Sequence, residues 1–311
     1  MFSLGAKVTE DTYITGTRRY LINKTVQIAS YLILLTVGMR INFSEKSLDD
    51  IDYSHYLGPN WKEQIRKIKS APKIISPHVS CFDIQVLLYL FGGNCSFVAG
   101  AFLKKVPILG KLAVKLGSVF VPRAGKSDAL NDVLVNIKKR AQMIDENKGG
   151  WPTMVIFPEG TCSNNTTLCK FRKGAFVDER NVLPLTIKYK HGMVHPAIES
   201  LDEPFMLFLI CCTLEPMEVE VKQLPIFAPN DYLFQAHADK GEERWEIFAW
   251  ACRDFMHKVG GFGRSNLAWK DKIKVYDYYM GKINQLTFEN GESIEYREDG
   301  KYTVDQIKKD A

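Results

Sequence analysis

The amino-acid sequence predicts an α/β fold, with a central mostly parallel or mixed sheet flanked by helices and an apolar helix near the N-terminus. Two observations indicate the sheet. Short apolar runs that are typical of buried strands occur at residues 73–75, 95–99, 119–121, 153–157 and 183–189. Segments with the helical spacing of about 3.6 residues stand between these runs. Strands that alternate with helices are characteristic of a domain built on one central sheet.

Three segments carry the helical spacing most clearly. Residues 81–91 form an apolar helix that ends at Gly92 and Gly93, because a glycine pair stops a helix. A second helix presents one apolar face, and a third ends at Gly260 and Gly261. The second helix has Leu130, Val133, Leu134, Ile137, Ala141 and Ile144 on its apolar face, the third has Trp245, Phe248, Cys252, Phe255 and Val259, and a further strand is expected around Val219 and Val221.

The composition divides the chain into three parts, residues 1–45, 46–283 and 284–311. The first is a leader with a membrane-associating segment at residues 25–39, which carries no charge. A helix needs about 20 apolar residues to span a bilayer, so this shorter segment suits a helix that lies in the membrane interface or enters one leaflet. A buried core helix is the alternative. The middle part is the globular domain.

The polar C-terminal part contains a hairpin pattern. Apolar and polar residues alternate between Ile294 and Val304, on either side of the turn sequence at residues 298–301. The same stretch does not fit a calcium-binding loop, because Arg297 and Gln306 stand where such a loop needs carboxylates. We therefore predict a hairpin rather than a metal site in this tail.

Charge and cysteine content limit the classes of function. A net charge of +5 is too small to indicate nucleic-acid binding. Basic residues gather at 104–115, 138–140 and 170–173, which suits phosphate-bearing substrates or an anionic bilayer, and a solvated face is the alternative for each cluster. The seven cysteines show no CxxC spacing, so we expect reduced thiols facing the cytosol and no structural metal.

The main chemical constellation is a histidine and an aspartate five residues apart, His78 and Asp83. Histidine is suited to take a hydroxyl proton near neutral pH, and a carboxylate can hold the imidazole in the required tautomer. On one continuous helix the two would point about 140° apart, so they meet only if His78 precedes the helix and Asp83 lies in its first turn. Ser80 is a suitable N-cap for this arrangement. The alternative is that Ser80 and Asp83 form only a capping box.

A second block, residues 155–161, is a buried strand that ends in a proline and opens into a glycine turn. The turn contains Glu159, Gly160 and Thr161. Its backbone N–H groups and the Thr161 hydroxyl can hold a phosphate or a glycerol hydroxyl. An ordinary strand-ending turn is the alternative, and the pattern alone does not distinguish the two.

Two more blocks end or interrupt strands. The third runs from Gly117 through Phe120 to Arg123, whose guanidinium can bind a phosphate with two parallel hydrogen bonds. A surface arginine is the alternative. In the fourth block Pro184 interrupts a strand at residues 182–187, which suggests a sheet edge or a bulge, since proline cannot donate to a neighbouring strand.

In this order and spacing, the four blocks resemble the motifs of the glycerophospholipid acyltransferase family (PlsC-like). Residues 161–176 look closest to lysophosphatidylcholine acyltransferases and the related eukaryotic glycerol-3-phosphate acyltransferases. The resemblance implies that His78 is the catalytic base and that Asp83 orients it. It implies substrate contacts for the other motif residues, Gly117, Phe120, Arg123, Glu159, Gly160, Thr161 and Pro184.

The resemblance also implies partners and location. Acyl-CoA would be a co-substrate, no cofactor or nucleic acid would take part, and the acceptor would be a lysophospholipid or a glycerol phosphate at the endoplasmic reticulum membrane, with the catalytic domain facing the cytosol. One departure leaves the acceptor head group open, because residues 99–103 lack the lysines of bacterial members. The alternatives are a glycerol-3-phosphate acyltransferase, a coenzyme-A-independent transacylase, a catalytically silent lipid-binding membrane protein, and a hydrolase that uses Cys81.

Overall fold

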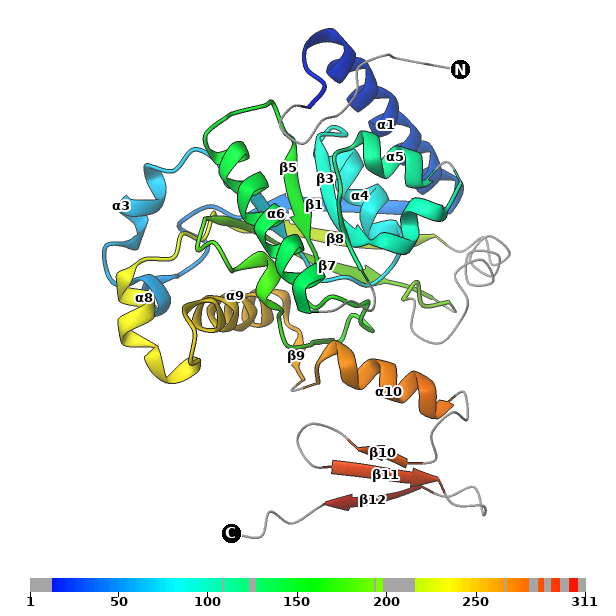
Figure 1. Ribbon diagram of the computed structural model, residues 1–311, viewed down its shortest axis with the longest axis vertical. Coiled ribbons are helices and arrows are strands. Elements are labelled where there is room, and N and C mark those ends of the chain that lie inside the picture. The colour runs from blue at the N-terminus through cyan, green and yellow to red at the C-terminus, as the bar shows by residue number, and fades with distance from the viewer. Residues whose placement is uncertain are drawn as a thin grey trace.

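The computed structural model describes residues 13–107, 109–122, 127–192, 194–197, 216–265, 267–279, 285–287, 292–296 and 302–306. Its central strands are β1 (Met39–Glu45), β2 (Lys73–Ile75), β3 (Cys95–Gly100), β4 (Val119–Val121), β5 (Thr153–Ile156), β7 (Val182–Lys190) and β8 (Met217–Gln223). They form one sheet in the order β1-β8-β7-β2-β5-β3-β4 (Figure 1). The five strands from β7 to β4 are parallel, whereas β8 is antiparallel to β7 and parallel to β1. The predicted central sheet is confirmed, and it is mixed.

Helices cover both faces of this sheet (Figure 1). On one face α1 (Gly16–Thr36) packs against α4 (Phe82–Leu90), and on the other lie α6 (Ser127–Asp145) and α9 (Arg244–Gly260). The remaining helices are α2 (Ser54–Leu57), α3 (Trp61–Arg66), α5 (Leu109–Lys115), α8 (Asp231–Ala236) and α10 (Trp269–Tyr279), and Thr167–Leu168 (β6) pairs with Gly263–Arg264 (β9) in a two-stranded sheet.

Two apolar clusters fill the space between the sheet and its helices. Neighbouring residues of β5 belong to different clusters, because successive side chains of a strand point to opposite faces. Val155 packs in the cluster that contains Leu34 of α1 and Leu87 of α4. Ile156 packs in the other cluster, with Phe248 of α9. β5 is therefore buried on both sides, as its unbroken apolar run predicts.

The helices and strands agree closely with the sequence pattern. α4 ends at Leu90, and Gly92 and Gly93 follow with φ of 64° and 71°, a left-handed conformation that favours glycine. α9 ends in the same way, with Gly261 at φ 60°. β4 has the predicted bounds, and β3, β5 and β7 differ from the prediction by one residue at one or both ends. The strand expected around Val219 is β8.

Pro184 does not lie on an edge strand. β7 is an interior strand, and Pro184 stands opposite Ile75 of β2. On its other side the regular ladder with β8 ends one residue away, at the pair Leu185–Gln223. The Pro184 carbonyl accepts from the Leu224 N–H at 2.9 Å. The missing N–H of proline is tolerated because it falls where the β8 ladder has stopped.

The N-terminal segment differs in part from the prediction. A helix is present, but it begins at Gly16 and ends at Thr36, and Val26, Ser30 and Leu34 form its buried face. The strand Met39–Glu45, which the sequence prediction assigned to the leader, belongs to the central sheet. Among the helices that the structure describes, none is both long enough and apolar enough to cross a bilayer. The division of the chain at residue 45 stays a prediction.

The tail forms a separate antiparallel sheet of β10 (Gln285–Thr287), β11 (Glu292–Tyr296) and β12 (Tyr302–Gln306). Ile294 stands opposite Val304, which is the pairing that the hairpin pattern predicts. The predicted turn at residues 298–301 lies outside the described residues. In Figure 1 this sheet lies below α10, away from the central sheet.

Candidate active site

The candidate site lies where β2 and β5 end. The two strands are parallel neighbours, so the loops that follow them meet at the same edge of the sheet. The loop after β2 carries His78, and the loop after β5 carries Glu159. The Ser163 N–H donates to the His78 carbonyl at 2.6 Å and joins the two loops. The topology thus brings together two sequence motifs whose key residues are 81 positions apart.

His78 and Asp83 meet in the way their spacing predicts. His78 lies in the loop before α4, and Asp83 lies in the first turn of that helix. The distance from His78 Nδ1 to Asp83 Oδ2 is 2.7 Å. The Asp83 side chain is fully buried, whereas 21% of the His78 side chain is exposed. The imidazole is held from the protein interior while part of the ring reaches solvent.

The carboxylate of Asp83 also caps the loop. Its Oδ2 accepts from the backbone N–H groups of Val79 at 2.7 Å and Ser80 at 2.9 Å. The Ser80 hydroxyl in turn accepts from the Phe82 N–H at 3.4 Å. Half of the predicted capping box is therefore present together with the histidine pairing, because the oxygen that accepts from the Ser80 N–H is the one that holds His78. The Asp83 N–H donates to the Ser80 carbonyl rather than to its hydroxyl, and the N-cap of α4 is Cys81.

The ring of His78 lies flat on Phe157, with 4.0 Å between ring centroids and 13° between the planes. Burial opposes the charged imidazolium, but a hydrogen bond and charge contact with the Cys162 sulfur, together with the Asp83 carboxylate, outweigh it. The pKa of His78 is raised from 6.5 to about 10 as a result. The free protein therefore holds a proton on this ring near neutral pH.

Glu159 is fully buried and faces the backbone. Its Oε2 accepts from the Cys169 N–H at 2.9 Å, and its Oε1 accepts from the His78 N–H at 3.4 Å. Burial raises the pKa of Glu159 to about 7, against the opposing effect of these two amides. The Glu159 carboxyl group thus contacts the His78 loop. The sequence pattern did not indicate this contact. Its predicted substrate contact stays a prediction.

Gly160 lies in the turn after β5, directly after Glu159. It has φ 70°, and an added Cβ would lie 2.6 Å from Cδ of Arg172. Only glycine fits both the backbone conformation and the close approach of that side chain. The Arg172 N–H donates to the Pro158 carbonyl at 2.7 Å, which keeps Arg172 beside the turn. Thr161 follows, half-buried. The structure therefore places a guanidinium next to the turn that was predicted to hold a phosphate.

The third block lies two strands away from this centre. Gly117 precedes β4 with φ 75° and packs against Trp151. Phe120 lies in β4, where Lys104 Nζ is 4.6 Å from its ring centroid. β3 separates β4 from β5. Arg123 lies outside the described residues, so its predicted phosphate contact stays a prediction.

Three residues near the pair were not identified from the sequence. The Tyr189 hydroxyl of β7 donates to Asp83 Oδ1 at 2.6 Å. Asn165 accepts from the Tyr189 N–H at 2.7 Å. Cys162 hydrogen-bonds His78. None of the described cysteines, which are Cys81, Cys95, Cys162, Cys169 and Cys252, forms a disulfide. The position of Cys162 directly after Thr161 was the only sequence signal for any of the three.

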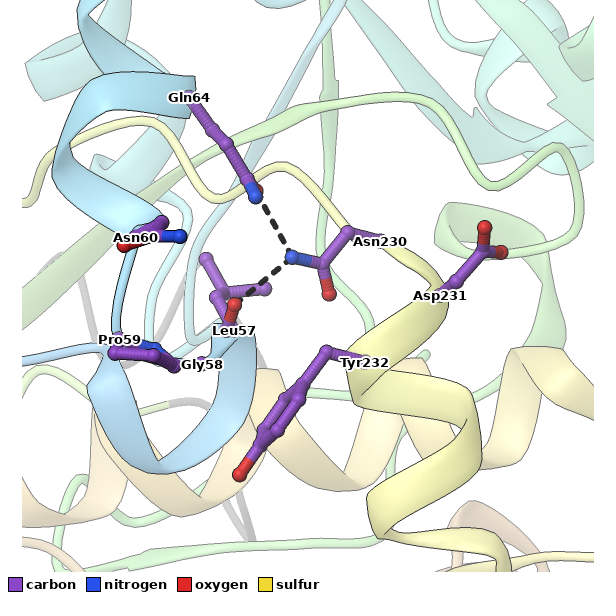
Figure 2. A pocket seen from close by; sticks show the side chains of 8 residues that line it. All are labelled: Leu57, Gly58, Pro59, Asn60, Gln64, Asn230, Asp231 and Tyr232. Atoms are coloured by element: carbon purple, nitrogen blue, oxygen red, sulfur yellow. Dashed lines mark hydrogen bonds between the residues drawn. The ribbon is translucent and has the colours of Figure 1, made fainter.

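A cavity of about 330 Å³ opens elsewhere, between α3 and the start of α8 (Figure 2). Asn230 bridges it by donating to the Leu57 carbonyl and to Gln64 Oε1, both at 2.9 Å. Its lining contains neither His78 nor Asp83. It offers no base beside a nucleophile, so we place the chemistry at His78. Within the described residues, no group of three His, Cys, Asp or Glu side chains is arranged to hold a metal.

The chain is similar to several known acyltransferases. Residues 62–188 match a family model described as Acyltransferase, and this range includes both loops. Lysophospholipid acyltransferase LPEAT1 of Arabidopsis thaliana is 30% identical over 213 residues, which cover 68% of this chain and 50% of that protein. A lysophosphatidylcholine acyltransferase of Drosophila melanogaster is 30% identical over 239 residues, 76% of this chain and 40% of that protein.

Other similar proteins are more distant or overlap less. Lysophosphatidylcholine acyltransferase 1 of Homo sapiens is 32% identical over 160 residues, 50% of this chain and 28% of that protein. The chain thus spans half or less of the length of these relatives. The solved 1-acyl-sn-glycerophosphate acyltransferase PlsC of Thermotoga maritima is 18% identical, with a TM-score of 0.45 over 78% of this chain and 80% of that chain, too distant a likeness to assign any residue.

Proposed function

Because the chain belongs to the acyltransferase family, we propose that it transfers an acyl group from acyl-CoA to the free hydroxyl of a lysophospholipid, with His78 as the general base. The observation that carries the proposal is the 2.7 Å contact between His78 Nδ1 and Asp83 Oδ2, behind a ring that keeps 21% of its side chain exposed. A buried acid behind an accessible imidazole is the arrangement that general base catalysis requires.

In the proposed reaction the acceptor hydroxyl lies against the exposed part of the His78 ring. The imidazole removes the hydroxyl proton while the oxygen attacks the thioester carbonyl. A carbon–oxygen bond forms, the carbon–sulfur bond breaks, and the leaving coenzyme A thiolate takes the proton from the imidazolium. Asp83 stabilises the imidazolium during this step. General base catalysis contributes about 10² to 10⁴ in rate, and the positioning of two substrates adds to it.

For the acceptor phosphate we propose the turn at Gly160 and Thr161 together with Arg172. The close approach of Arg172 to Gly160 supports this assignment. Burial lowers the pKa of Arg172 below its usual value, yet an arginine remains charged at any physiological pH. A guanidinium beside the hydroxyl of Thr161 is suited to bind a phosphate. Arg123 is the second proposed contact.

For the membrane we propose that α1 lies in the interface with its outer face toward lipid. Val26 and Leu34 fix the inner face of α1 against α4. The outer face is apolar along most of its length, whereas Lys24 is exposed beside it. Such a helix lies in the headgroup region with its apolar side chains in the acyl chains. The exposed apolar residues of α1 are Tyr20, Leu21, Ile28, Tyr31, Leu32, Ile33 and Leu35. The location at the endoplasmic reticulum stays a prediction.

The proposal is tested by mixing the purified protein with labelled acyl-CoA and, in turn, lysophosphatidylcholine, lysophosphatidylethanolamine, lysophosphatidate and glycerol-3-phosphate. We expect free coenzyme A thiol to appear only when an acceptor is added, and at the highest rate with a lysophospholipid. Transfer to glycerol-3-phosphate alone would support the first alternative. Transfer between phospholipids without acyl-CoA would support a transacylase. No acyl transfer under any of these conditions would leave the lipid-binding alternative.

The contact between Cys162 and His78 favours a second candidate, a thioester hydrolase in which the Cys162 thiolate attacks the acyl group. This candidate replaces the Cys81 hydrolase considered from the sequence. It predicts thiol release in the absence of any acceptor, and loss of that release in Cys162→Ala. We expect instead that Cys162→Ala retains acceptor-dependent transfer, because the base and its acid remain in place.

A further inference from the structure

The two oxygens of Asp83 are held by different kinds of donor. Oδ2 accepts three N–H groups, from His78 Nδ1, Val79 and Ser80. Oδ1 accepts the hydroxyl of Tyr189 at 2.6 Å. Asp83 is fully buried, and the Tyr189 side chain is buried beside it. The tyrosine is thus the donor that satisfies the oxygen facing away from the histidine.

Tyr189 reaches Asp83 because β7 is longer than β2. Their parallel ladder ends at the pair Ile75–Pro184, after which β2 gives way to the His78 loop. β7 continues to Lys190 and stays straight because it pairs with β8, where Tyr189 stands opposite Val219. Tyr189 therefore lies beyond the end of β2, at the level of the first turn of α4.

Asn165 fixes the same stretch of β7 from the loop after β5. Its side-chain oxygen accepts from the Tyr189 N–H at 2.7 Å, and its side-chain amide donates to the Ile187 carbonyl at 2.8 Å. Asn165 is itself buried and has φ 65°, which asparagine tolerates better than most residues. The loop that carries Glu159 is thereby tied to the strand that carries Tyr189.

We propose that Tyr189 is a positioning residue for the transfer reaction, which keeps the Asp83 carboxylate turned toward His78. This inference rests on the function proposed above. Without the hydroxyl, Oδ1 would be a buried carboxylate oxygen that lacks this hydrogen bond, and such groups are strongly disfavoured. The carboxyl group would then rotate away from His78, and this change weakens its support of the imidazolium.

The expected kinetic result of Tyr189→Phe is a fall in kcat of about tenfold with KM nearly unchanged, because the tyrosine touches neither substrate. The pH dependence should also move. Weaker support of the imidazolium lowers the pKa of His78, so the loss of the Tyr189 hydroxyl should shift the acid limb of kcat/KM to lower pH by up to about one unit. Within the part of the chain that the structure describes, the other titratable groups that face the pair are Cys81, Cys162 and Glu159.

The chain offers a matched control in Tyr56→Phe. The Tyr56 hydroxyl donates to Asp254 Oδ2 at 2.6 Å, and both side chains are buried. The control loses a tyrosine–carboxylate hydrogen bond of equal length that does not involve His78. We expect Tyr56→Phe to leave both kcat and the pH profile of transfer unchanged.

A double-mutant cycle separates positioning from general damage. If Tyr189 acts through Asp83, then Tyr189→Phe combined with Asp83→Asn should be no slower than Asp83→Asn alone. Should Tyr189→Phe fail to fold, a ring-fluorinated tyrosine at position 189 keeps the hydroxyl and makes it a stronger donor, which holds Asp83 more firmly, so the acid limb should move to higher pH.

The outcomes can be told apart. If the wild-type protein transfers no acyl group, the proposed function is wrong, and the double-mutant cycle cannot be measured. If the wild type is active and Tyr189→Phe behaves like Tyr56→Phe in kcat and pH profile, Tyr189 has no positioning role. Rate losses that multiply in the double mutant would also overturn the inference.

Discussion

Two buried aspartates in this protein accept a tyrosine hydroxyl at the same distance of 2.6 Å, and they are used differently. Asp254 of α9 pairs with Tyr56 of α2. It also forms ion pairs with Arg264 of β9 at 2.6 Å and with Lys258 of the same helix at 2.7 Å. Its charge is balanced by two permanent cations, and it joins α2, α9 and β9. This is the usual arrangement of a structural ion pair.

Within the described residues, Asp83 forms no such ion pair with a lysine or an arginine. It accepts two backbone amides, one tyrosine hydroxyl and His78. The only partner of Asp83 that can carry a positive charge in this set is the imidazole. The comparison teaches that an aspartate supports a proton-accepting histidine when its hydrogen bonds are satisfied by neutral donors, because its charge then remains to stabilise the imidazolium.

The largest expected effect is a difference in kcat/KM between variants of the two aspartates. Asp83→Asn should lower kcat/KM for acyl transfer by 100-fold or more, because an amide cannot stabilise the imidazolium. Asp254→Asn should change kcat/KM less than threefold, yet lower the free energy of unfolding by about 1–3 kcal/mol through its lost hydrogen bonds. Steady-state kinetics and urea denaturation measure these quantities. Equal kinetic losses in both variants would contradict the comparison.

The pH dependence gives the next largest effect. Because the proton must leave His78 before it can act as a base, and its pKa is raised to about 10, kcat/KM should rise as pH increases from 7 toward 10. The sign for stability is opposite: the contribution of the imidazolium is present below pH 6.5 and lost as pH rises through about 10. Asp254→Asn should leave the kinetic profile in place. A flat profile over this range would argue against His78 as the base.

Glu159 is a third buried carboxyl group that can be compared with Asp83 and Asp254. It accepts two backbone amides, those of Cys169 and His78. In Glu159→Gln one of these N–H groups would face an NH₂ group, so we expect kcat to fall about tenfold as the His78 loop loses its support. Steady-state kinetics at saturating acceptor measure it. A change confined to the KM for the acceptor would instead support the substrate contact implied by the sequence.

Much of this site could be predicted because it is local. His78 and Asp83 are five residues apart, and the start of α4 between them is set by nearby residues. The Glu159 loop could be named from its own turn sequence. The approach of this loop to His78 could not be predicted, because it depends on β2 and β5 being neighbours in the sheet. The sequence of either strand alone does not reveal the strand order.

The parts that were missed depend on contacts distant in sequence. Tyr189 and Asp83 are 106 residues apart, and a tyrosine near the end of an apolar strand reads as ordinary core. β1 was assigned to the leader although Met39, Ile41 and Phe43 alternate with polar residues, a strand signal next to a longer apolar helix. Pro184 suggested an edge strand because proline cannot donate a hydrogen bond to a neighbouring strand. In the structure the ladder with β8 stops next to Pro184, and β8 lies about 35 residues later in the sequence, so the local pattern could not show it.

The smallest expected effect concerns a surface that touches neither aspartate. Replacing Ile28 and Leu32 of α1 with serine should weaken binding to anionic phospholipid vesicles about five- to tenfold, because both side chains are more than half exposed and would enter lipid. Stability should not change. Val135→Ser on α6 is the matched control, since Val135 is 61% exposed on the opposite side of the sheet. Vesicle sedimentation measures binding, and equal loss in the control would rule out α1 as the docking face.

The central claim is that an imidazole held by a buried acid removes the acceptor proton. The most direct measurement is the rate of acceptor-dependent thiol release by His78→Ala, with folding verified by thermal unfolding beside the wild type. We predict a loss of at least 100-fold while the protein remains folded. A folded variant that keeps more than about a tenth of the wild-type rate would show that another group accepts the proton.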